Sequence, residues 1–128
     1  MSRKLFVQSA FFATFVGAFA SLQPLQAAPA GPDGDLLFRQ RCSMCHSVVP
    51  SQPKPLAPGL SGVVGRKAAS TQFNYSAALK ASNLTWTKPN LDRYLSAPMR
   101  MVPGTRMAVS VPDAAQRAAL IKYLETKK

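Results

Sequence analysis

The sequence predicts an all-α domain with three to five helices joined by long loops. Beyond the N-terminal segment, no stretch alternates apolar and polar residues over more than a few positions, so the pattern of a β-strand is absent. Several segments instead begin with helix-capping residues and carry apolar residues three or four positions apart. Between these segments the chain is rich in proline and glycine and shows neither the helical nor the strand spacing of apolar residues, which indicates loops.

The first expected helix follows the acidic stretch 33–35, because acidic residues stabilise a helix N-terminus. Its apolar side begins at residue 36 and continues to the cysteines. A short helix opens at residues 73–76, with Ser76 as its cap, and runs through Lys80.

A third helix is expected over residues 91–97, ending before Pro98. Trp86, the only tryptophan, is most simply a core residue whose N–H needs a partner. The last helix has the clearest pattern, because Asp113 and Gln116 form a capping box ahead of an apolar side and a basic end. We expect it to pack on the first helix.

The only two cysteines and the only histidine lie together in Cys42-Ser43-Met44-Cys45-His46. If this stretch is helical, Cys42, Cys45 and His46 point the same way, since residues three and four apart share a face. Two thioether bonds to the haem vinyl groups would then fix the cofactor, and His46 would coordinate its iron. The motif therefore predicts one covalently attached haem c.

Three other interpretations of the cysteines are weaker. A redox pair of the thioredoxin kind expects a preceding strand and a βαβ pattern, and neither is present. Structural zinc needs four ligands, and the chain has no further Cys or His to supply them. A structural disulfide closing so short a loop would restrain little of the unfolded chain.

The N-terminus has the layout of a secretory signal, with a basic start, an apolar segment at 5–22 and a small-residue stretch after it. A signal peptide over residues 1–27, with cleavage after Ala30 as the alternative, leaves one small domain at 31–128. A retained membrane anchor is the competing interpretation, because the apolar segment approaches the length that spans a bilayer. The polar, proline-marked exit favours removal.

The chain is strongly basic, with 16 Lys and Arg against 5 Asp and Glu and a formal charge of +11. Loss of Arg3 and Lys4 with the signal leaves 14 against 5, a formal charge of +9. Such a surface speeds encounter with acidic partner proteins. Nucleic acid is not an expected partner, since no run of basic residues is longer than two and the signal layout predicts export.

Residues 50–58 contain four prolines and have no helical or strand period. The first three are expected only to stiffen a surface loop. Pro58 lies 12 residues after His46, where its carbonyl could accept the outer imidazole N–H and orient the ring.

The second iron ligand is expected from Met99, Met101 or Met107, since Met44 would project away from the face of the cysteines. Met107 is the choice, because it follows a loop whose proline and glycine hold the backbone extended. A methionine otherwise simply fills core space. An iron held by both His46 and Met107 has no open position for a substrate, which favours a carrier over a catalyst.

The chain resembles the class I c-type cytochromes, the mitochondrial cytochrome c family and its bacterial relatives. The resemblance covers nearly all of residues 34–124. It rests on Cys-Ser-Met-Cys-His, Pro-Gly-Leu-Ser-Gly-Val-Val-Gly-Arg-Lys, Phe-Asn-Tyr-Ser, Thr-Trp, Tyr-Leu before Pro98, Pro-Gly-Thr-Arg-Met and Arg-Ala-Ala-Leu-Ile-Lys-Tyr-Leu, in this order.

The resemblance implies the cytochrome c fold wrapped around one haem, with His46 supported by the Pro58 carbonyl and with Met107 on the other side. It implies that Tyr94 donates a hydrogen bond to the Met107 sulfur. It also implies that Gly34 and Phe38 meet Tyr123 where the first and last helices cross. The residues implied to neutralise or hydrogen-bond the haem propionates are Arg66, Tyr75, Trp86 and Thr105.

Some positions depart from the family pattern. Leu79 replaces a common asparagine, which removes a polar group near the haem. Met99 and Arg100 replace the usual pair of lysines, and Met101 stands where an aromatic residue is common. The expected docking surface is therefore less basic and more apolar.

The function implied is that of a soluble, monomeric, monohaem one-electron carrier in a periplasmic respiratory or photosynthetic chain. Its expected partners are acidic redox proteins such as an oxidase, reductase, dehydrogenase or reaction centre, with no stable membrane insertion after signal cleavage. Two alternatives stay open. One is a haem enzyme or gas sensor with a labile sixth ligand, and the other is a periplasmic thiol-disulfide oxidoreductase using Cys42 and Cys45.

Overall fold

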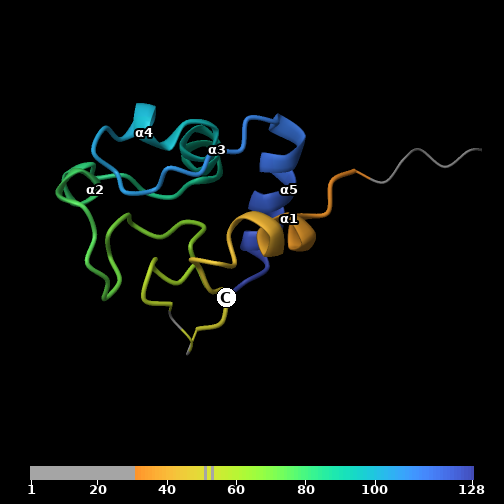
Figure 1. Ribbon diagram of the computed structural model, residues 1–128, viewed down its shortest axis with the longest axis horizontal. Helices are drawn as coiled ribbons and strands as arrows, with labels where there is room; N and C mark the ends of the chain where they lie inside the picture. Colours follow the sequence, from red (N-terminus) through yellow and green to blue (C-terminus); the bar gives the residue numbers. More distant parts are fainter. Residues whose placement is uncertain (1–30, 51, 53) are drawn as a thin grey trace, which may run out of the picture.

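A computed structural model describes residues 31–50, 52 and 54–128, and within them the fold is all-α, as the sequence predicts (Figure 1). The expected signal peptide lies outside the described residues, as does one of the loop prolines, Pro53. The described part has no β-strand, only two isolated bridges. It contains the helices α1 (Gly34–Arg41), α2 (Ala77–Ala81), α3 (Lys88–Ser96), α4 (Pro98–Met101) and α5 (Ala114–Glu125). None of these helices has the length and apolar character needed to cross a bilayer.

Helix α1 begins where the acidic stretch predicts. The Asp33 carboxylate accepts the backbone N–H groups of Asp35 and Leu36, at 2.9 and 3.4 Å, and so caps the helix. The helix ends at Arg41, because the N–H groups of residues 42 and 43 both bond the Phe38 carbonyl and the chain widens into a turn. The cysteine motif therefore lies on a turn that follows the helix and not on a helix.

Helices α1 and α5 pack against each other, as expected, and lie side by side in Figure 1. Their backbones approach at Gly34, where an added Cβ would lie 2.2 Å from the Ala119 carbonyl oxygen. The Phe38 and Tyr123 rings meet at this crossing with centroids 5.4 Å apart. Helix α5 has the predicted cap, since the Asp113 carboxylate accepts the Gln116 N–H at 2.7 Å.

Helix α3 begins at Lys88, three residues earlier than the expected start at residue 91. The Thr87 hydroxyl caps it by accepting the Asn90 N–H at 3.3 Å, and Pro89 fits the first turn, where no N–H is needed. Pro98 ends α3 as predicted but also starts α4, a four-residue helix that the sequence pattern does not indicate.

The loops close the side of the molecule that α1, α3 and α5 leave open. Helix α2 is short and capped by Ser76, whose hydroxyl accepts the Leu79 N–H at 3.2 Å, as expected. The long loop after the cysteines returns to the helices where the Gly65 N–H donates to the Trp86 carbonyl at 2.9 Å. Trp86 is a core residue and packs on Tyr94 with ring centroids 4.8 Å apart.

Candidate haem site

A largely apolar cavity of about 420 Å³ lies between α3, α5 and the loops. Its walls include leucines from several parts of the chain, among them Leu60, Leu91, Leu95 and Leu120. All ten residues that the sequence singles out line this one cavity: Cys42, Cys45, His46, Pro58, Arg66, Tyr75, Trp86, Tyr94, Thr105 and Met107.

The two cysteines lie on the turn after α1 and line the cavity. The Cys42 carbonyl accepts the N–H groups of Cys45 and His46, at 3.1 and 2.8 Å, and so holds the motif in one compact turn. Burial raises the pKa of the Cys42 thiol, because the thiolate loses hydration there, and the nearby charge of Arg41 only partly opposes this. Met44 points outward, 82% exposed, as expected.

The imidazole of His46 is held by backbone. Its Nδ1 lies 2.8 Å from the Pro58 carbonyl oxygen, 12 residues along the chain. Burial lowers the pKa of His46, and the hydrogen bond to Pro58 partly opposes that change. The ring is therefore neutral near pH 7 and donates through Nδ1, which leaves the lone pair of Nε2 available to a metal.

Arg66 stiffens the loop that supplies this carbonyl. Its guanidinium donates to the carbonyls of Ser61 and Gly59, at 2.7 and 2.8 Å. The Leu60 N–H also donates to the Ser47 carbonyl at 2.7 Å, which ties the loop to the residue after His46. Pro58 is thus fixed from both sides.

Met107 lies in the segment between α4 and α5 and is partly buried against the core. Two residues before it, the buried Thr105 hydroxyl pairs with the Tyr94 hydroxyl at 2.6 Å. Burial raises the pKa of Tyr94, so the phenol is protonated and able to donate, although the bond to Thr105 partly opposes the shift.

The Tyr94 pairing differs from the expectation that this hydroxyl donates to the Met107 sulfur. Among the described residues, its hydrogen-bond partner is Thr105. The hydroxyl of Thr105 lies within reach of the phenol because the residue is buried on the same cavity wall, and an oxygen is a stronger acceptor than a thioether.

Three of the four residues expected near the propionates, Arg66, Tyr75 and Thr105, have side-chain polar atoms that already bond within the protein. Tyr75 pairs with the Thr71 hydroxyl, and its ring packs edge-on against Phe73 at 5.1 Å. Leu79 lines the cavity, as its departure from the family pattern predicts, and makes that wall apolar. Met99 is 59% exposed and does not line the cavity.

The donor set fits a haem. Two thiols and a neutral imidazole lie at one part of an apolar cavity, and a thioether lies at another part of the same cavity. A haem c needs these four sulfur and nitrogen groups and a surrounding from which water is excluded.

A family model described as Cytochrome c matches residues 32–128. The chain belongs to the cytochrome c family. Members of this family carry one covalent haem c and transfer electrons, so this cytochrome c binds one covalent haem c and is an electron carrier.

The relatives agree with this membership. The chain is 43% identical over 96 residues to cytochrome c2 of Rhodomicrobium vannielii, covering 73% of this chain and 76% of that protein. It is 40% identical over 104 residues to cytochrome c type-1 of Ascaris suum, covering 76% and 92%. Among solved structures, cytochrome cH from Methylobacterium extorquens superposes with a TM-score of 0.68 and 35% identity, covering 75% of this chain and all of that one.

Sequence reasoning finds the polar residues of the site but not its apolar walls. Leu60, Leu91 and Leu120 are ordinary apolar residues in the sequence, and only tertiary packing brings them to the haem site. Leu60 lies in a loop with no period, and the helical spacing of Leu91 and Leu120 predicts that they are buried but not which group they pack against. The local signal for the polar residues was stronger because a motif with fixed spacing carries chemistry.

Proposed function

We propose that this cytochrome c is a soluble one-electron carrier in a periplasmic respiratory or photosynthetic chain. The observation that carries the proposal is the convergence of Cys42, Cys45, His46 and Met107 on one apolar cavity. The bound haem supplies the one-electron change between ferric and ferrous iron. Everything else that the function needs comes from the chain, which binds, orients and shields the cofactor.

Cys42 and Cys45 would form the thioether links to the haem, and His46 and Met107 would hold its iron. The Pro58 carbonyl keeps the His46 ring in one tautomer and one orientation. The soft thioether of Met107 favours ferrous iron and raises the reduction potential relative to a second nitrogen ligand. With His46 and Met107 both holding the iron, electron exchange would require little movement of the protein.

Arg66, Tyr75, Trp86 and Thr105 surround the propionates in this assignment. All four line the cavity, and Arg66 is the cationic group among them. Its side chain is already fixed by two backbone carbonyls, so its charge is held in place before the cofactor binds. A fixed charge stabilises a partly buried carboxylate better than a mobile one.

Residues 1–27 direct export, with cleavage after Ala27 or Ala30, and residues 31–128 form the carrier domain. Support comes from the family match, which begins at residue 32, and from relatives in bacteria. The basic surface favours acidic redox partners. The intact mass of protein recovered from the periplasm distinguishes the two cleavage sites, and a full-length chain would contradict removal.

The pKa of Cys42 does not support the alternative function of a thiol-disulfide oxidoreductase. Redox-active thiols have a lowered pKa, because the thiolate is the nucleophile. Burial here raises the pKa of the Cys42 thiol. A raised pKa lowers the thiolate fraction, which does not favour thiol-disulfide exchange at Cys42.

The substitution Met107→Ala tests the ligand assignment. The ferric holoprotein should show a weak methionine-to-iron absorption band, and the variant should lose it while keeping the covalent haem. Met99→Ala is the matched control, because Met99 is exposed and does not line the cavity, and it should keep the band. A band that persists in Met107→Ala contradicts the assignment of Met107 as the ligand.

Carbon monoxide binding separates the carrier from the alternative functions. Binding to the ferrous wild type at neutral pH would favour a haem enzyme or sensor over an electron carrier.

A further inference from the structure

The segment from α4 to α5 carries Met107 between two anchors. Upstream, Thr105 pairs with Tyr94 of α3, and Arg106 donates to the Asn74 carbonyl at 2.8 Å. Downstream, the Val111 N–H donates to the Leu95 carbonyl of α3 at 2.8 Å. Residues 108–110 between them are exposed and make no hydrogen bond with the residues that the structure describes. The position of Met107 therefore depends on both anchors.

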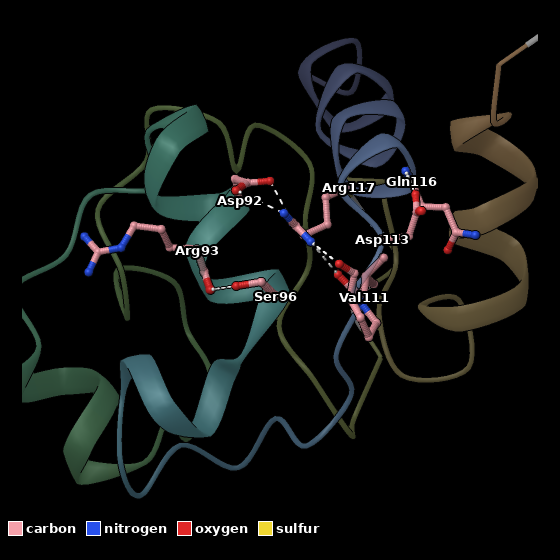
Figure 2. A network of polar contacts seen from close by, with 8 residues as sticks. Asp92, Arg93, Ser96, Val111, Asp113, Gln116 and Arg117 are labelled. Carbon is pink, nitrogen blue, oxygen red and sulfur yellow. Dashed lines mark hydrogen bonds and ion pairs between the residues drawn. The ribbon is translucent and has the colours of Figure 1, made fainter.

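The downstream anchor is built around one side chain, Arg117 of α5 (Figure 2). Its Nη1 donates to the carbonyls of Val111 and Pro112, at 3.1 and 2.6 Å. Its Nε donates to Asp92 Oδ1 of α3 at 2.7 Å, and Nη2 lies 3.5 Å from Asp92 Oδ2. We call these four residues the Arg117 cluster.

Two members of the Arg117 cluster, Arg117 and Val111, are largely shielded from solvent, whereas Asp92 and Pro112 are more exposed. The Arg117 side chain is 11% exposed and that of Asp92 is 44% exposed, while Val111 is 1% exposed. A buried carbonyl that loses its donor is costly, and a planar guanidinium can serve a carboxylate and two carbonyls at once. A lysine offers a single point charge and cannot reproduce this fork.

We propose that Arg117 is a positioning residue for Met107, holding the end of the ligand segment on α3 so that the thioether stays at the cavity. The proposal rests on Met107 being the axial ligand. Without the Arg117 cluster, only the Val111 N–H bond to the Leu95 carbonyl holds the downstream end of the segment on α3. A segment with fewer anchors leaves the cavity more often, because fewer contacts in the closed form oppose the conformational entropy gained on opening.

Imidazole binding to the ferric holoprotein measures this opening, because imidazole reaches the iron only when the methionine leaves. In Arg117→Met we expect the apparent Kd for imidazole to fall about tenfold, the factor for losing one charge-assisted hydrogen bond from the closed form. The methionine-to-iron band reports the same displacement. The apparent imidazole Kd of Arg117→Lys should lie between those of Arg117→Met and the wild type.

The control is Lys88→Met. Lys88 and Glu125 form the other ion pair between α3 and α5, at 2.7 Å, but it is exposed, and among the described residues no hydrogen bond joins these side chains to the Met107 segment. This variant should leave the imidazole Kd unchanged. If Arg117→Met and Lys88→Met shift the Kd equally, or if neither shifts it, the proposal is wrong.

Asp92→Asn provides a test that spares the fold if Arg117→Met does not fold. It removes only the carboxylate charge that orients the guanidinium, and we expect the imidazole Kd to fall about threefold. An unchanged Kd in Asp92→Asn would overturn the role of the cluster. Failure of the ligand assignment is distinguishable, because Met107→Ala would then keep its band whatever the Arg117 variants do.

Discussion

Single residues in this cytochrome c depend on partners that the backbone provides. His46 is neutral because burial lowers its pKa, and it is oriented because the Pro58 carbonyl accepts its N–H. The acceptor is a main-chain oxygen, so its position is set by the loop and by Arg66, which bonds the next carbonyl. Ligand geometry on this side of the cavity is thus a property of the folded loop.

On the other side of the cavity, the Tyr94 and Thr105 hydroxyls are buried partners, and their bond is testable by a double-mutant cycle. Tyr94→Phe and Thr105→Val should each lower the free energy of unfolding by about 1 to 2 kcal/mol, since each leaves a buried hydroxyl unpaired. The double variant should cost less than the sum by about 1 kcal/mol. Denaturant unfolding of the four proteins measures this.

The same variants decide between two partners for the phenol. If Tyr94 instead donates to the Met107 sulfur, Tyr94→Phe would shift the methionine-to-iron band, and Thr105→Val would not. The Tyr94–Thr105 pairing would be wrong if the unfolding free-energy changes of the two single variants simply added in the double variant and Tyr94→Phe also shifted the band.

At the scale of helices, the contact of α1 with α5 depends on one missing side chain. A Cβ at Gly34 would lie 2.2 Å from the Ala119 oxygen and 2.8 Å from Tyr123 Cβ, closer than atoms can approach. The two helices would have to move apart, which would break the contact between the Phe38 and Tyr123 rings.

Gly34→Ala should therefore lower the free energy of unfolding by about 3 kcal/mol, the upper range for overpacking, despite the better helix propensity of alanine. Gly31→Ala is the control, because a Cβ there meets nothing within 4 Å, and it should change stability by less than about 0.5 kcal/mol. Thermal unfolding of both holoproteins measures the difference. Equal stability of the two variants would contradict the close crossing.

The sequence predicts the helices that have caps and misses those features that depend on tertiary contacts. Asp33, Ser76 and Asp113 mark helix starts through their own side chains. The start of α3 was placed too late because the apolar pattern begins after its cap at Thr87. Helix α4 has four residues, too few to show a period.

The candidate site likewise has residues that the sequence predicts and residues that only tertiary packing brings together. The cysteine motif and the family resemblance place ten residues around the cavity, because those residues carry their chemistry in their identity and spacing. The Arg117 cluster is not predictable from the sequence, since Asp92 and Arg117 are 25 positions apart and each looks like an ordinary solvent-exposed charge. Their pairing depends on how α3 and α5 pack.

At the scale of the whole molecule, cofactor and core are one structure. The core leucines Leu91, Leu95, Leu120 and Leu124 also line the haem cavity, so the apolar faces of α3 and α5 form both the core and the wall of the cofactor site. A domain of this size buries only a modest core by itself. Holding the haem by covalent bonds therefore also holds the fold together.

The central claim is that one haem is bonded to Cys42 and Cys45, and peptide mapping of the purified native protein tests it most directly. Trypsin should release a peptide spanning residues 42–66, because Lys54 precedes a proline and resists cleavage. We predict that this peptide carries the mass of one haem and that neither cysteine reacts with iodoacetamide after reduction. A colourless peptide with both thiols alkylated would contradict the assignment.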